Sequence, residues 1–132
     1  MYKEYNPNPS GSKTIDCAVR ALCAVLEKPW KTVYAALSVW GMKMHTWGNV
    51  DPVWGAYLRS KGYEREVIPN TCPDCYTVAD FAADHPEGRY VLGTGTHAVA
   101  VINGDIWDSW DSSAEIPIFY YAKKEGVTDG VQ

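Results

Sequence analysis

The sequence lacks several features that would assign it to large classes of protein. None of its apolar runs reaches the length of a membrane-spanning helix, and the first residues, MYKEYNPNPSGSK, lack the apolar stretch of a signal peptide. Lys and Arg number 12 against 16 Asp and Glu, so the formal net charge is −4, and no stripe of basic residues offsets it. Because phosphate binding favours a basic surface, we expect neither a nucleic-acid partner nor a membrane, and we expect a cytoplasmic location.

The chain also lacks internal repeats, and its length of 132 residues suits one domain. Hydrophobic residues make up 46% and charged residues 21%, which favours a folded globular chain over a disordered one. We therefore predict a single domain over residues 1–132. Its ends are expected to be irregular, with an extended arm at 1–13, rich in Asn, Pro, Ser and Gly, and a frayed polar tail at 125–132.

Apolar periodicity predicts helices in the first half of the chain and mostly strands in the second. Helices are expected at 15–27, where Thr14 or Asp16 can cap the start, at 30–40, ended by Gly41, at 52–61, ended by Gly62, and at 77–85, which begins with the capping box Thr77-x-x-Asp80. Strands are expected at 63–69, 89–95, 96–102, 105–110 and 116–124. The predicted fold class is α+β, with N-terminal helices packed on one side of a C-terminal antiparallel β-sheet.

A predicted hairpin places a histidine near an aspartate. Asn103-Gly104 suits a two-residue turn, which fixes the register of the strands. In that register His97 lies opposite Trp110, diagonal to Asp108 and on the same face. Diagonal Cβ atoms lie roughly 7–8 Å apart, so the two side chains can close a hydrogen bond of about 2.8 Å. We predict that His97 meets Asp108, either as part of a site or as a polar pair on a solvated face.

Cys17 is expected in the first turn of the first helix. Unpaired N–H groups and the positive end of the helix dipole stabilise a thiolate there. Cys23, further along the same helix, is interpreted as a small buried apolar residue. Together with His97 and Asp108, Cys17 would supply a thiol nucleophile, its base and the group that orients the base. The alternative is that Cys17 only packs in the core.

These residues carry a resemblance to a known family. DCAVRAL at 16–22, followed by HAVAVINGDIWDSW at 97–110, resembles the papain-like cysteine peptidase superfamily. It is most similar to small bacterial and phage proteins related to the bacteriocin-processing peptidase domains of ABC transporters. The resemblance implies a papain-like fold in which Cys17 is the nucleophile, His97 the base and Asp108 the orienting acid. For a phage-encoded member the location would be the host cytoplasm.

The chain departs from this family at the oxyanion site. These peptidases usually carry a glutamine about half a dozen residues before the cysteine, whereas the only glutamine here is Gln132. The backbone N–H of Cys17 can donate one bond, and we expect Ser10, Ser12 or Asn8 to supply the second. Loss of one such donor typically costs on the order of a hundred- to thousandfold in rate.

The remaining cysteines and histidines form no complete metal site in the sequence. Cys72-Pro73-Asp74-Cys75 is one Cys-x-x-Cys pair, and a structural zinc site usually needs two pairs, although His85 could be a further ligand. We expect a tight turn with two partly buried thiols, and neither metal nor cofactor. His45, Trp47 and Trp110 are candidates for the wall of a substrate groove.

We therefore predict a cysteine peptidase or amidase-type hydrolase. It would cleave a peptide, isopeptide or related amide through a Cys17–His97–Asp108 triad and a thioester intermediate, with a peptide or protein as partner. The alternative is a non-catalytic phage-type module that binds a protein through a Trp-rich surface on the same fold. The absent glutamine favours this alternative, and the complete triad favours the enzyme.

Overall fold

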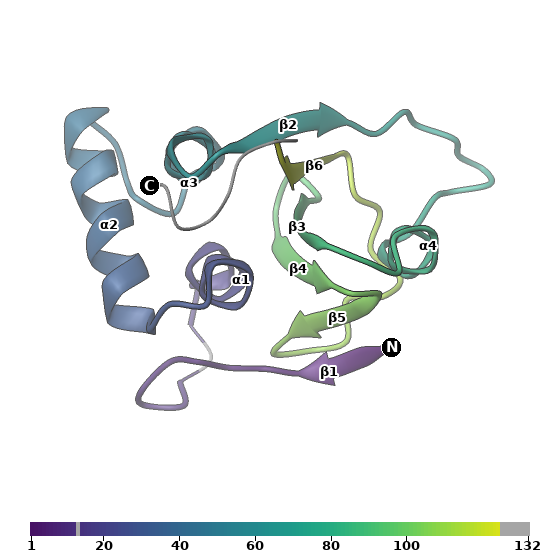
Figure 1. The fold of residues 1–132 in the computed structure, drawn as a ribbon, viewed down its shortest axis with the longest axis horizontal. Coiled ribbons are helices and arrows are strands. Elements are labelled where there is room, and N and C mark those ends of the chain that lie inside the picture. Colours follow the sequence, from purple (N-terminus) through teal and green to yellow (C-terminus); the bar gives the residue numbers. More distant parts are fainter. Residues whose placement is uncertain (13, 125–132) are drawn as a thin grey trace.

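The computed structural model describes residues 1–12 and 14–124, and in this part of the chain four helices flank a six-stranded mixed sheet (Figure 1). The elements are β1 (Tyr2–Glu4), α1 (Cys17–Leu26), α2 (Trp30–Lys43), α3 (Asp51–Ser60), β2 (Tyr63–Val67), α4 (Val78–Asp84), β3 (Arg89–Gly93), β4 (Ala98–Ile102), β5 (Asp105–Asp108) and β6 (Phe119–Lys123). The α+β class is therefore confirmed. The tail predicted at 125–132 lies outside the described residues.

The sheet has the strand order β1-β5-β4-β3-β6-β2. Strands β3, β4 and β5 form an antiparallel meander, β6 pairs with the other side of β3, and β2 pairs with β6. The expectation of a purely antiparallel sheet is wrong, because β1 pairs in parallel with β5. Residues 2–4 were expected in an extended arm, since Tyr-Lys-Glu carries no strand pattern. The exposed backbone groups at the edge of β5 supply the pairing that makes them a strand.

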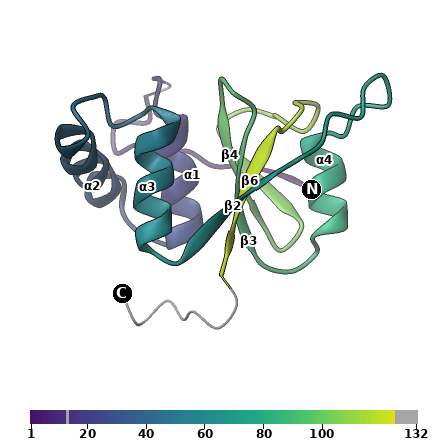
Figure 2. The same cartoon turned by 90° about the horizontal axis from the view of Figure 1, so that it is seen from above.

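The helices cover both faces of the sheet, and not one side as predicted. Figure 2 shows α1, α2 and α3 on one side and α4 on the other. Alternate strand residues divide accordingly: Ala98 and Ala100 pack in the cluster that contains α1, whereas Val99 and Val101 pack with Phe81 of α4. Strands that are apolar on both faces need a cover on each, and the unbroken apolar run of β4 was the signal for this.

Helix α2 continues past Gly41 to Lys43, so the predicted stop at Gly41 is wrong. Gly41 instead allows a close approach, since a Cβ there would lie 2.7 Å from the carbonyl oxygen of Thr46. A Cβ on Gly48 would lie 2.8 Å from the carbonyl oxygen of Leu37. These two glycines let the loop of residues 44–50 pack directly on α2, and Trp47 of this loop lines a cavity that also reaches Asp16.

Candidate active site

Helix α1 begins at Cys17, which places this cysteine in the first turn, as predicted. Asp16 is the N-cap residue, but its side chain makes no capping hydrogen bond. Its carboxylate accepts bonds from Arg20 and from Trp30 Nε1, the latter at 2.9 Å. The N–H groups of the first turn are therefore left without this side-chain partner, and their partial positive charge favours a thiolate at Cys17.

The contact between His97 and Asp108 follows from the hairpin register. Ile102 lies opposite Asp105 across the Asn103-Gly104 turn, as predicted. His97 Nε2 lies 2.6 Å from Asp108 Oδ2. The predicted face of the sheet is wrong, however. Strand alternation would place His97 and Asp108 on the same face as Val99, which packs toward α4, but the pair contacts α1 on the opposite face. His97 precedes β4 and Asp108 ends β5, so strand alternation no longer fixes the direction of these side chains.

The Asp108 carboxylate is buried and has several partners. The residue is 2% exposed, and its carboxylate accepts the backbone N–H of Ser109 and the hydroxyl of Ser112, each at 2.7 Å. Arg20 Nη2 lies 3.5 Å from Asp108 Oδ1. Burial raises the pKa of this carboxyl, but the bonds from His97, Ser112 and Ser109 and the charge of His97 lower it below its ordinary value. The alternative of a polar pair on a solvated face is therefore wrong.

Cys17, at the start of α1, contacts His97, which directly precedes β4. Burial raises the pKa of the half-buried Cys17 thiol. Hydrogen bonds from His97 and from the backbone N–H of Ala98, with the charges of His97 and Arg20, outweigh burial and hold the pKa below its ordinary value. Since Nε2 of His97 faces Asp108, Nδ1 is the ring nitrogen left for the sulfur. The three predicted residues therefore converge, with the imidazole in the middle.

His97 is held in its protonated form by its two neighbours. Burial lowers the pKa of the imidazole, but the hydrogen bonds to Asp108 and Cys17 and the charges of both raise it to about 9. A lowered thiol pKa beside a raised imidazole pKa favours a thiolate–imidazolium pair near neutral pH. Such a pair can attack a carbonyl carbon and then donate a proton to a leaving group.

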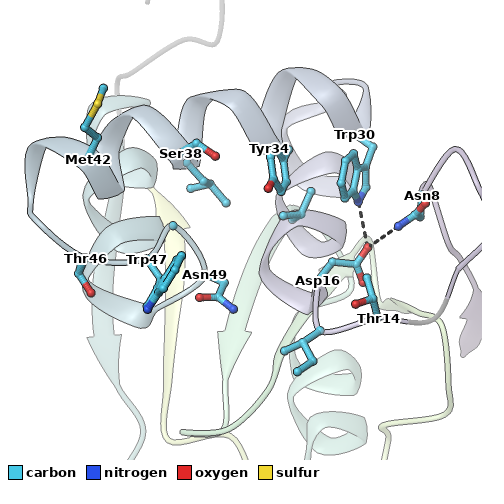
Figure 3. Close-up of a pocket in the computed structure, with 14 residues that line it drawn as sticks. Asn8, Thr14, Asp16, Trp30, Tyr34, Ser38, Met42, Thr46, Trp47 and Asn49 are labelled. Atoms are coloured by element: carbon cyan, nitrogen blue, oxygen red, sulfur yellow. Dashed lines mark hydrogen bonds between the residues drawn. The ribbon is translucent and has the colours of Figure 1, made fainter.

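A cavity of about 700 Å³ lies beside the start of α1 (Figure 3). The N-terminal arm, the residues before Cys17, helix α2 and the loop of residues 44–50 enclose it. Its walls include the aromatic rings of Trp30, Tyr34 and Trp47. Several large hydrophobic side chains that are exposed in this protein line it, namely Ile15, Tyr34, Met42 and Trp47. The cavity therefore offers an apolar, aromatic wall that reaches Asp16, the residue before Cys17, whereas Cys17, His97 and Asp108 are not among the residues that line it.

The three predicted groove residues occupy different places. Trp47 lines the cavity and is 79% exposed. His45 lies in the same loop, is exposed and does not line the cavity. Trp110 does not line the cavity; its ring packs against His97 at a tilt of 41°, with 4.8 Å between the ring centroids. Trp110 therefore shields the imidazole.

Of the oxyanion candidates, Asn8 lies nearest to the site. Its amide lines the cavity and donates to Asp16 Oδ2 at 3.3 Å (Figure 3). Ser10 and Ser12 are exposed in the turn that follows. The hydroxyl of Ser10 donates to Asn8 Oδ1 at 2.8 Å, and the same hydroxyl accepts the backbone N–H of Ser12 at 3.3 Å. Both serines therefore support Asn8 and do not themselves line the cavity.

The other cysteines lie in separate environments. Cys23 is buried in the core, as predicted. Cys72 and Cys75 form a disulfide, so the expectation of two thiols is wrong; their positions three residues apart in one turn bring the sulfurs together. His85 packs on Phe81, whose carbonyl oxygen lies 2.8 Å from His85 Nδ1. Within the described residues, no group of three or more His, Cys, Asp or Glu could hold a metal.

Sequence reasoning missed two residues of the site, Arg20 and Ser112. Arg20 contacts both Asp16 and Asp108, and its spacing of four residues from Asp16 was an available signal for the first contact. Ser112 lies in the turn after β5, and no sequence pattern indicated that its hydroxyl would bind Asp108.

Comparisons with known proteins find no match: no family model, no curated protein and no solved structure matches the chain. Over residues 1–12 and 14–124, no helix is both long and apolar enough to cross a membrane. The chemistry of the site must therefore be argued from its own geometry.

Proposed function

We propose that the protein is a papain-like cysteine hydrolase that cleaves a peptide, isopeptide or related amide bond. One arrangement carries the proposal: the Cys17 thiol lies beside His97, which lowers its pKa, and His97 Nε2 lies 2.6 Å from the buried carboxylate of Asp108. A solvated surface pair would not need this burial, and a packing cysteine would not need an imidazole.

The reaction uses these three side chains in two steps. The Cys17 thiolate attacks the carbonyl carbon, the C=O electrons move to oxygen, and the tetrahedral intermediate collapses as the C–N bond breaks. His97 gives its proton to the leaving amine, and a thioester remains on Cys17. His97 then takes a proton from water, the resulting hydroxide attacks the thioester, and the acid and the thiolate are released. Asp108 orients the ring and stabilises the imidazolium throughout.

The oxyanion would be held by the backbone N–H of Cys17 and the side-chain amide of Asn8. One N–H of that amide bonds Asp16, and an amide nitrogen carries a second hydrogen. The bond from Ser10 to Asn8 Oδ1 fixes the amide with its nitrogen toward Asp16, the residue before Cys17. Asn8→Ala should therefore lower kcat by about a hundredfold with little change in KM.

The cavity that Asp16 and the loop of residues 44–50 line would bind part of the substrate, with the scissile bond outside it at Cys17. Its volume of about 700 Å³ falls within the range of about 300–1,000 Å³ typical of ligand pockets. The carboxylate in its wall, Asp16, is already bound by Arg20, Trp30 and Asn8. An apolar segment of a polypeptide therefore suits this cavity better than a charged one.

A protein-binding module is the second candidate, and the exposed apolar wall of the cavity favours it. Trp47, Met42 and Ile15 all line the cavity and are all exposed, and exposed apolar side chains grouped in this way mark many interaction surfaces. In this case binding would occur without turnover, and His97 and Asp108 would contribute only to stability.

The experiment that separates the two candidates is hydrolysis of a peptide library, with intact-protein mass spectrometry to detect the thioester. The Cys17→Ala variant tests the nucleophile, and Cys23→Ala on the same helix is the matched control. If the protein is a hydrolase, we expect product and a transient mass increase in wild type and Cys23→Ala, and neither of them in Cys17→Ala. Binding of the same peptides by wild type and Cys17→Ala without product would favour the module.

A further inference from the structure

Arg20 is a buried cation that the proposed chemical steps do not use. It lies in the first turn of α1, is 5% exposed, and its Nη1 donates to Asp16 Oδ1. Its Nη2 lies 3.5 Å from Asp108 Oδ1 at the end of β5. One guanidinium therefore connects the residue that precedes the nucleophile with the residue that binds the base.

The need to neutralise a buried charge does not explain both contacts. A buried guanidinium needs a carboxylate partner, and Asp16 alone provides one within the same helix. The second contact reaches a different element of the fold. A planar guanidinium with five donors can bridge two carboxylates at fixed positions, whereas a lysine ammonium behaves as a single point charge.

The partners of Asp108 are divided between its two oxygens. Oδ2 accepts the hydroxyl of Ser112 and faces His97 Nε2. Oδ1 accepts the N–H of Ser109, which belongs to the adjacent residue, and faces Arg20. Arg20 is therefore the contact on Oδ1 that comes from another element. It opposes rotation of the carboxylate away from the imidazole.

We propose that Arg20 is a positioning residue that ties the start of α1 to the end of β5 and so sets the contact between Cys17 and His97. The inference rests on the proposed function, because it treats Cys17 and His97 as the reacting pair. The charge of Arg20 also contributes to the lowered pKa of Cys17. Both effects act through other residues, and Arg20 itself need not touch the substrate.

The test compares two arginines that bind opposite ends of α1. Arg89 donates to the carbonyl oxygens of Ala24 and Val25 at 2.9 and 3.3 Å, far along the helix from Cys17. The full chain would be made as Arg20→Lys, Arg20→Met and the control Arg89→Met. Thermal unfolding reports stability, and the pH midpoint of Cys17 alkylation by iodoacetamide reports the thiolate–imidazolium pair.

We expect both control and test variants to lose stability, but only the Arg20 variants to change the pH profile. A rise of one unit in the Cys17 midpoint corresponds to about a tenfold loss of thiolate on the acid side, and we expect about this loss in Arg20→Met. Arg20→Lys keeps the charge but cannot bridge both carboxylates, so a smaller shift is expected. If Arg20→Met does not fold, Arg20→Lys decides. A wild-type midpoint in the folded Arg20 variants would overturn the proposal.

A second readout separates this inference from the proposed function. The NMR signals of the His97 ring report its contact with Asp108 whether or not any peptide is cleaved. We expect the ring to titrate at lower pH in Arg20→Lys than in wild type and Arg89→Met. If no substrate is hydrolysed but this shift occurs, the positioning role stands and the proposed hydrolase fails. If hydrolysis occurs and the ring titrates alike in all three proteins, the positioning role fails.

Discussion

The two cysteines of α1 lie on the same helix but differ in their surroundings and in the direction of their pKa shifts. Cys17 lies at the first turn, beside His97 and near Arg20, and the pKa of its thiol is lowered despite burial. Cys23 lies in the apolar core, where burial and the charge of Asp16 raise the pKa of its thiol to about 12. Cys17 is half-buried and Cys23 is fully buried, and burial raises the pKa of both thiols, so the lowered pKa of Cys17 comes from its neighbours. The neighbouring His97 therefore makes Cys17 a nucleophile candidate, whereas Cys23 only packs in the core.

The largest effect is expected from His97→Ala, which removes the imidazole beside Cys17. Hydrolysis should fall by about 10²–10⁴-fold, because the base and the proton donor are lost together. The pKa of the Cys17 thiol should then rise toward that of an ordinary cysteine. Peptide hydrolysis and Cys17 alkylation rates would be measured at the same pH values. A variant that keeps most of its activity would show that His97 is not the base.

A smaller effect is expected from Asp108→Asn, which keeps the shape of the site and removes one charge. The pKa of His97, about 9 in the wild-type protein, should fall in this variant. At pH values above the pKa, each unit by which the pKa falls lowers the population of imidazolium about tenfold. We expect kcat/KM to fall by about ten- to a hundredfold. An NMR titration of His97 checks the cause, and an unchanged His97 titration would contradict it.

The same variant makes a prediction about stability and pH. The Asp108 carboxyl has a lowered pKa in the folded protein, so its contribution is complete above its unfolded pKa of about 3.9 and is lost as the pH falls through the folded value. Chemical denaturation should therefore show a stability gap between wild type and Asp108→Asn at pH 6 that narrows below about pH 3.9. A gap that stays constant with pH would mean that the lost interaction is not ionic.

Trp47→Ala tests the cavity separately from the two cysteines, because it alters the cavity wall and leaves Cys17 and Cys23 in place. Because Trp47 is 79% exposed, its removal should cost little stability and should leave the alkylation of Cys17 unchanged. We expect KM for an apolar peptide to rise by about fivefold to thirtyfold, equivalent to about 1–2 kcal/mol of binding. Trp110→Ala is the matched variant at the other tryptophan, and it should change kcat as well, because the ring of Trp110 packs against His97. An unchanged KM in Trp47→Ala would place the substrate elsewhere.

The smallest effect is expected at the other pair of cysteines, Cys72 and Cys75. Cys72→Ser with Cys75→Ser removes a disulfide that closes a very short loop in an exposed turn. Short loops restrict the unfolded chain little, so we expect a loss of at most about 2 kcal/mol and no change in hydrolysis. Denaturant unfolding and peptide hydrolysis check both points. A loss of activity in the folded double variant would connect this turn to the site.

Much of this arrangement was predictable from local signals in the sequence. The Asn103-Gly104 turn sets the register that brings the positions of Asp108 and His97 close together. The helix expected from residue 15 begins at Cys17, because Asp16, one of the two predicted caps, is the N-cap residue. These features depend on neighbouring residues and on two regular periods, 3.6 and 2 residues. The Thr77–Asp80 capping box was predictable for the same reason.

The features that the sequence could not supply depend on contacts between distant elements. Tyr2–Glu4 becomes a strand only because β5 offers an edge, and Gly41 lies within a helix because the loop at Thr46 crosses it. The bridge from Arg20 to Asp108 needs the packing of α1 on the sheet to be known first. Local pattern therefore predicted the positions of the three central residues along the chain. Tertiary contacts determine the direction of the His97 and Asp108 side chains, the support of the site and the wall of the cavity.

The most direct test of the account is the pH dependence of alkylation at Cys17 and Cys23 in one sample of the folded protein, read by mass spectrometry. The account predicts that Cys17 reacts fast and keeps reacting below pH 7, that Cys23 stays unmodified, and that His97→Ala shifts the Cys17 profile toward an ordinary thiol with a pKa of about 8.5. A Cys17 profile that already follows an ordinary thiol in wild type, and that His97→Ala leaves unchanged, would contradict it.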